Sequence, residues 1–152
     1  MNITSKSKYA LRAVIHLART RSNSARREDL AAAQGGISME YLEKILIRLR
    51  EARVLTAKSG PGGGYRLARP AEELTAWDVI KAVEGSPAPV ACLDDSANHC
   101  SLNCEAKPFW ERVWHAAVME MQNTSISSLA AGAASLDDIR NLPESERMAH
   151  CR

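Results

Sequence analysis

Three cysteines lie close together in the second half of the chain. Cys92, Cys100 and Cys104 are separated by seven and three residues. Several thiols within so short a stretch can bind metal, because thiolate sulfur is a soft ligand. Three chemistries fit the spacing: an iron–sulfur cluster with one further ligand, a zinc ion held by the three thiolates and His99, and a thiol switch that forms a disulfide on oxidation. The spacing alone does not choose among them.

A glycine-rich stretch, SGPGGGYRLARP, is the second notable feature. Four of the chain's eight glycines lie between Gly60 and Gly64. A phosphate-binding P-loop would need Lys followed by Ser or Thr after the last glycine, at the start of a helix. Here the glycines lead into the strand-like run Tyr65-Arg66-Leu67. They therefore predict the turn of a β-hairpin between residues 54–58 and 65–69, with or without a ligand at its tip.

The elements before the hairpin indicate why it is there. Apolar periodicity predicts helices over residues 4–21, 28–34 and 39–52. Gly35 and Gly36 end the second helix, and Ser38 is placed to cap the third. Two helices joined by such a turn and followed by a hairpin indicate a mainly α fold, a winged helix-turn-helix domain with a two-stranded β wing. Glycines at the wing tip would let it approach a DNA backbone closely.

A long C-terminal helix is predicted from Pro108 to Thr124, after a shorter one over residues 75–84 that Thr75 and Asp78 cap. Its apolar residues form one continuous edge, made by Trp110, Trp114, Ala117 and Met121. A chain of this size has little else to cover that edge. We therefore expect a second copy to cover it, in a homodimer built on this dimerisation helix.

We expect four segments along the chain. These are a winged helix-turn-helix DNA-binding domain (1–85), a cysteine-containing loop that is the candidate cluster-binding segment (86–106), the dimerisation helix with a short following helix (107–131), and a flexible tail (132–152).

The two halves of the chain also differ in charge. Residues 1–70 carry 14 Lys and Arg against 5 Asp and Glu, whereas residues 71–152 carry 6 against 13. The basic half suits a polyanion such as double-stranded DNA. No transmembrane segment or signal peptide is apparent, so we expect a cytoplasmic protein with reduced thiols and no membrane partner. No catalytic triad, metal-hydrolase motif or nucleotide loop is present, so an enzyme is not expected.

The DNA surface can be sketched from the exposed polar residues. Base contacts are expected from the start of the third helix: Ser38, Met39, Glu40, Glu43 and Lys44. Wing contacts are expected from Lys58, Ser59, Gly62 and Gly63. Phosphate contacts are expected from the basic residues Lys6, Lys8, Arg12, Arg26, Arg27, Lys44, Arg48, Arg50 and Lys58.

The motifs TSKSKYALRA, ISMEYLEKILIRLREA and GPGGGYRLA, together with the three-cysteine loop, resemble the Rrf2 family of bacterial transcription regulators. The resemblance covers about residues 1–130. It implies a homodimer in which Cys92, Cys100 and Cys104 hold a [2Fe–2S] or [4Fe–4S] cluster, whose state decides operator binding in response to redox, iron or nitric oxide. Glu43 stands where the resembling iron–sulfur regulators have a glutamate that can accept a hydrogen bond from cytosine N4.

The chain also departs from those regulators. Lys107 occupies the place of a ligating histidine, Lys8 that of an acidic ligand from the partner, and Ser59 that of a wing-tip arginine. The fourth cluster ligand is therefore open; the candidates are His99, Asp94, Asp95, Glu105, a water and a small thiol. The alternative function is a regulator of the same fold without a cluster, which senses thiol oxidation, zinc or a protein partner.

Overall fold

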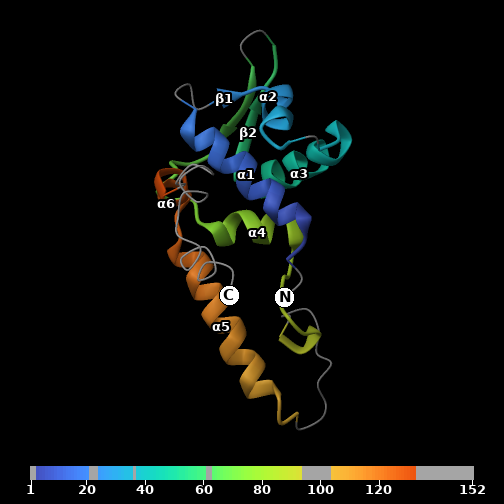
Figure 1. The fold of residues 1–152 in the computed structure, drawn as a ribbon, viewed down its shortest axis with the longest axis vertical. Helices are drawn as coiled ribbons and strands as arrows, with labels where there is room; N and C mark the ends of the chain where they lie inside the picture. Colours follow the sequence, from blue (N-terminus) through green and yellow to red (C-terminus); the bar gives the residue numbers. More distant parts are fainter. Residues whose placement is uncertain (1–2, 21–23, 36, 61–62, 94–103, 133–152) are drawn as a thin grey trace, which may run out of the picture.

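The computed structural model describes residues 3–20, 24–35, 37–60, 63–93 and 104–132. Its elements follow in chain order (Figure 1): α1 (Ser5–Arg19), β1 (Ser24–Ala25), α2 (Arg27–Ala32), α3 (Met39–Glu51), β2 (Leu55–Lys58), β3 (Gly64–Leu67), α4 (Ala76–Glu84), the short 3₁₀ helix η1 (Ala91–Leu93), α5 (Lys107–Asn123) and α6 (Ile126–Gly132). The mainly helical prediction is confirmed.

The helix starts follow the predicted capping signals. The Ser38 hydroxyl accepts a hydrogen bond from the Tyr41 amide at 3.3 Å, and the Thr75 hydroxyl accepts one from the Asp78 amide at 3.2 Å. The Asp78 carboxylate in turn accepts from the Thr75 amide at 3.0 Å, which completes a capping box. Because each cap depends on residues three apart, the helix starts can be predicted from the sequence alone.

Helices α1, α2, α3 and α4, which with the small sheet form the head of the molecule, share one hydrophobic core. α3 buries the side of its surface that faces α1, α2 and α4, and the fully buried residues include Leu30, Leu42, Leu46, Leu49 and Leu17. Burying one leucine side chain stabilises a fold by about 1.5–3 kcal/mol. This packing fixes which side of α3 is left to face outwards.

α3 ends in a tight turn whose key position is not a glycine. The Val54 amide donates to the Leu49 carbonyl at 2.9 Å, and the Arg53 amide donates to the Arg50 carbonyl at 3.0 Å. These two bonds form a Schellman motif, which places Arg53 in the left-handed region at φ 56°. Arg53 is the only described non-glycine residue with a positive φ.

The predicted hairpin is present, within a sheet of order β1-β3-β2. In its antiparallel register Leu55 pairs with Leu67 and Lys58 with Gly64. The third strand, β1, pairs Ser24 with Arg66, and it was not predicted. Two residues are too few to show the alternation that marks a strand.

The sheet explains two of the clustered glycines. A Cβ on Gly64, at φ +149°, would lie 2.6 Å from the Ala25 carbonyl oxygen of β1. A Cβ on Gly63 would overlap the carbonyl oxygen of Lys58 across the hairpin. Glycine is therefore required at both positions by the sheet and the turn themselves, with or without DNA.

α5 extends away from the head, and α6 returns to pack against α1 (Figure 1). Ile126 of α6 is fully buried in the core of the head, and its amide donates to the Leu74 carbonyl at 2.7 Å. The boundaries predicted for the four segments stay a prediction, but α6 packs with the head. No helix in the described part of the chain is long and apolar enough to cross a membrane.

Candidate functional site

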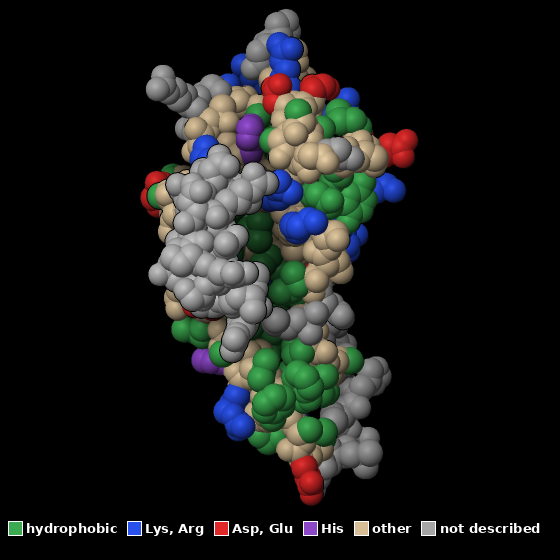
Figure 2. Space-filling view, viewed as in Figure 1, with side chains coloured by type: hydrophobic (Ala, Val, Ile, Leu, Met, Phe, Trp, Pro, Cys, Tyr) green, Lys and Arg blue, Asp and Glu red, His purple; other side chains and the backbone are tan. Residues whose placement is uncertain are grey.

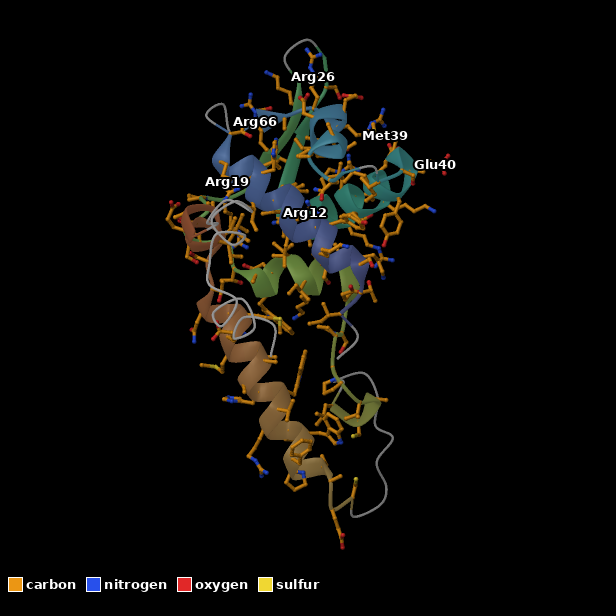
Figure 3. All side chains as sticks on the ribbon, in the orientation of Figure 1. Arg12, Arg19, Arg26, Met39, Glu40 and Arg66 are labelled. Atoms are coloured by element: carbon orange, nitrogen blue, oxygen red, sulfur yellow. The ribbon has the colours of Figure 1, made fainter. Side chains whose placement is uncertain are left out.

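The start of α3 is the first part of the candidate site. Met39 and Glu40 project from the outer end of this helix, whose opposite side lies in the core (Figure 3). Ser38, Glu40 and Lys44 are exposed, whereas Met39 and Glu43 are partly buried. The predicted base-reading residues therefore lie together at one end of one helix, as a recognition helix requires.

Glu43 has an ion-pair partner that the sequence did not indicate. Its Oε2 lies 3.3 Å from Nη1 of Arg27, the first residue of α2. The neighbours of Glu43 one turn away in its own helix, Met39 and Ile47, carry no charge. The pair joins residues 16 positions apart in the chain, so it becomes visible only when α2 and α3 are packed together.

The wing and the start of α2 enclose a second part of the site. They line a hollow of about 490 Å³, formed by Arg26, Arg27, Glu28, Lys58, Ser59, Gly60, Gly63, Gly64 and Tyr65. Arg26 lies beside the hairpin (Figure 3), and neither Arg26 nor Lys58 forms an ion pair with a described carboxylate. Uncompensated cations around an open hollow suit a phosphate group. Gly62 lies outside the described residues.

The predicted basic residues outside this hollow differ in whether their charged groups already have a partner within the protein. Nζ of Lys8 lies 4.7 Å from the centre of the Tyr9 ring, a cation–π contact that leaves the ammonium exposed. Arg48 donates from Nη1 to the Val83 carbonyl at 3.3 Å. Lys6 pairs with Glu84 at 3.3 Å. Counting cations in the sequence therefore overstates the number available to phosphates.

Glu84, the last residue of α4, binds the start of α1 with both carboxylate oxygens. Oε1 accepts hydrogen bonds from the Thr4 amide at 2.8 Å, the Thr4 hydroxyl at 2.7 Å and the Ser7 hydroxyl at 2.8 Å, while Oε2 faces Lys6. The side chain is only 4% exposed. Burial raises the pKa of Glu84, but the bonds from Thr4, Ser7 and Lys6 outweigh it and lower the pKa from 4.5 to about 2.

The last turn of α4 thus touches both helices that face the candidate DNA surface. Glu84 holds the start of α1, and the Val83 carbonyl accepts from Arg48 of α3. Gly85, at φ 79°, follows directly and turns the chain towards the cysteine segment. These contacts of Glu84 and Val83 with α1 and α3, made directly before the cysteine segment, form what we call the α4 joint.

The cysteine loop is described only at its two ends. Cys92 is partly buried in η1, Cys104 is exposed three residues before the start of α5 at Lys107, and both are free thiols. Cys100 and His99 lie outside the described residues, and no cluster of three potential metal ligands occurs within the described ones. Lys107 pairs with Glu111 at 3.7 Å.

The predicted apolar edge of α5 is partly covered, because Trp110, Trp114, Ala117 and Met121 are each partly buried. No residue of α5 is buried. The Trp114 ring packs edge-on against Trp77 of α4, with centroids 5.8 Å apart. Two other apolar side chains of α5, Phe109 and Met119, are 52% and 42% exposed. Figure 2 shows hydrophobic side chains gathered over the lower half of the molecule, where α5 lies, and most of the Lys and Arg side chains above it.

This combination of a capped outward-facing helix, a cationic wing and a long helix that leaves apolar side chains exposed defines a winged helix-turn-helix DNA-binding protein. Comparison with known proteins narrows the class. The model of the Rrf2 family, described as iron-dependent transcriptional regulators, matches residues 3–132. The chain belongs to this family, and it is a DNA-binding transcription regulator rather than an enzyme.

Three relatives illustrate the similarity. The protein rrf2 of Nitratidesulfovibrio vulgaris is 33% identical over 138 residues, which cover 88% of this chain and 90% of that protein. The regulator IscR of Cereibacter sphaeroides is 38% identical over 86 residues, or 55% of this chain and 56% of that protein. The solved structure of CymR, the global cysteine regulator of B. subtilis, superposes with a TM-score of 0.71 at 28% identity, covering 86% of this chain and 97% of that one.

Proposed function

We propose that the chain acts as a homodimer that binds an operator through α3 and the wing, and that an iron–sulfur cluster on Cys92, Cys100 and Cys104 controls this binding. The observation that carries the proposal is the α4 joint, the set of contacts that the last turn of α4 makes with α1 and α3. There Glu84 accepts from Ser7 of α1 and the Val83 carbonyl accepts from Arg48 of α3, just before the chain enters the cysteine segment.

The dimer is supported by the state of α5. The 17-residue helix α5 has no buried residue, and Phe109 and Met119 expose about half of their apolar side chains to water. Covering this helix with the same helix of a second copy buries both faces at once. A two-fold dimer also presents two copies of α3, which suits a DNA site made of two half-sites.

The cluster is supported by the chemistry of the donors. Two free thiols frame the loop, one at η1 and one just before α5, and the sequence places a third between them. Thiolates are the ordinary ligands of iron–sulfur clusters, and such a cluster supplies one-electron and iron-dependent chemistry when bound. The iron-dependent description of the family and the similarity to IscR agree with this choice.

Control would pass through the loop into α4. A group held by Cys92 and Cys104 would fix the end of η1 relative to the start of α5, and α5 packs on α4 through Trp114 and Trp77. A movement of α4 would then change the contacts that its last turn makes with α1 and α3, whereas a fixed α4 would keep these two helices in place. A coupling free energy of about 1–3 kcal/mol is typical of such regulation and is enough to change operator occupancy.

A regulator without a cluster is the second candidate. Cys104 is an exposed free thiol, which is the condition for oxidation to sulfenic acid or a disulfide. The three thiolates with His99 could instead bind zinc. In both cases the wing, α3 and the α4 joint would act as proposed above.

Purification without oxygen tests the cluster directly. The protein is expected to be brown and to contain iron and acid-labile sulfide, and Cys100→Ala should lose both while remaining dimeric. Cys151→Ala is the matched control, because it removes the one cysteine outside the loop, and it should keep the colour. A colourless protein with one zinc per chain would establish the zinc site instead, and one with neither metal would favour the thiol switch.

A further inference from the structure

We infer that Arg27 sets how strictly Glu43 discriminates between base pairs. This inference rests on the proposed role of Glu43 in reading a base. The structure adds a charged partner for Glu43 on a different helix, and that partner lies next to the wing. Arg27 would therefore be a specificity-determining residue, although it need not contact a base.

The geometry places Arg27 between two carboxylates. Its Nη1 lies 3.3 Å from Oε2 of Glu43, and its Nη2 lies 3.7 Å from Oε1 of Glu28. Its Nε is buried and has no hydrogen-bond partner among the described residues. The guanidinium is thus held against α3 with its free edges directed to acids, rather than being fully extended into solvent.

The pair is also open enough for DNA to change it. The Arg27 side chain is 41% exposed and the Glu43 side chain 47%. Arg27 lines the hollow between α2 and the wing together with Lys58, where a phosphate would fit. When DNA binds, Arg27 therefore has three anions within reach, Glu43, Glu28 and a phosphate.

The consequence for base reading follows from electrostatics. A carboxylate pressed against DNA is unfavourable unless a donor such as cytosine N4 meets it, and this penalty is what rejects other bases. At a wrong base, the Arg27 guanidinium still supplies a positive charge and a donor to Glu43. The wrong base is then penalised less. Arg27 therefore lowers discrimination at the base pair that Glu43 reads.

A different role for Arg27 predicts a different result. If Arg27 only contacts a phosphate, its loss weakens binding to every sequence equally, because phosphate contacts carry no base information. If Arg27 acts through Glu43, its loss changes the ratio between sequences, and only while Glu43 keeps its charge. A double-mutant cycle separates the two.

The probe is the duplex that the wild-type protein selects from a pool of randomised DNA. The dissociation constant is measured on this duplex and on its single base-pair substitutions, for wild type, Arg27→Gln, Glu43→Gln and the double variant. Arg27→Gln should raise discrimination at the Glu43-dependent base pair about three- to five-fold, the effect of an exposed ion pair. In the Glu43→Gln background the same change should leave the ratio unaltered.

Two further variants complete the experiment. Arg27→Lys keeps the charge and should restore most of the wild-type ratio, and Arg26→Gln removes a neighbouring charge that pairs with no described carboxylate and should lower all affinities alike. An unchanged ratio for Arg27→Gln, or an equal change with and without Glu43, would overturn the inference. Selection of no sequence by the wild type would instead refute the proposed function.

Discussion

The Glu84 contacts give a stability prediction that can be worked out from the structure. Glu84→Gln keeps the shape of the side chain but removes the negative charge that faces Lys6 and accepts from Thr4 and Ser7. The pKa of Glu84 falls from 4.5 to about 2 in the folded protein. At about 1.4 kcal/mol per pH unit, this difference corresponds to about 3 kcal/mol of stability at neutral pH.

The sign of the pH dependence follows from the direction of the shift. The unfolded chain binds a proton at Glu84 near pH 4.5, and the folded chain binds it only near pH 2. The stabilisation is therefore complete above about pH 5 and is lost as the pH falls through this window. It should amount to about 3 kcal/mol at pH 7 and to about half of that at pH 3.

Urea unfolding of wild type and Glu84→Gln at these two pH values measures the difference directly. Glu51→Gln is the matched control, because Glu51 is also the last residue of its helix but is exposed and forms no ion pair with a described residue. It should change the free energy of unfolding by less than about 0.5 kcal/mol. A Glu84→Gln effect no larger than this control, or one that does not decline at low pH, would refute the reasoning.

Three further predictions concern other parts of the molecule. Trp110→Glu should convert the dimer to monomers in analytical ultracentrifugation, because it places a charge on the apolar edge of α5 at a residue whose ring packs against Phe109 of the same helix, and a persistent dimer would exclude that edge as the interface. Arg53→Gly should raise the free energy of unfolding by about 0.5–1 kcal/mol, because glycine adopts the positive φ of 56° without strain, and a loss of stability in urea would contradict this. Glu43→Gln should reduce discrimination at one base pair by about 1–3 kcal/mol, whereas Lys58→Ala should weaken binding to all duplexes alike; fluorescence anisotropy titrations with substituted duplexes would expose the opposite pattern.

The features that could be predicted from the sequence are those set by neighbouring residues. The Ser38 and Thr75 caps depend on residues three positions away, and the hairpin depends on glycines within its own turn. The stripe of leucines on α3 follows from helical periodicity and is buried as expected. In each case the determining residues are close enough in the chain for a local rule to apply.

The features that were missed connect distant parts of the chain. β1 exists only because β3 is available to pair with it, and the Glu84 contacts join residues 77 and 80 positions apart. The relative positions of the cysteine sulfur atoms could not be predicted either, because the spacing of residues in a loop does not determine the direction of their side chains. Lys6 and Lys8 were predicted as phosphate contacts from their charge alone. The fold then places Glu84 beside Lys6 as an ion-pair partner.

The two ion pairs at the candidate DNA surface differ in a way that matters for regulation. The Glu84 side chain is 4% exposed and receives three hydrogen bonds besides Lys6, so DNA could take Lys6 only by leaving a buried carboxylate without its cation. The Glu43 side chain is 47% exposed, so water can take the place of Arg27 beside Glu43, and a phosphate can take the place of Glu43 beside Arg27, at little cost. The first pair therefore belongs to the framework that positions α1, whereas the second can respond to the sequence being read. Lys6 and Arg27 carry the same charge, so their different roles come from the burial of their partners, Glu84 and Glu43.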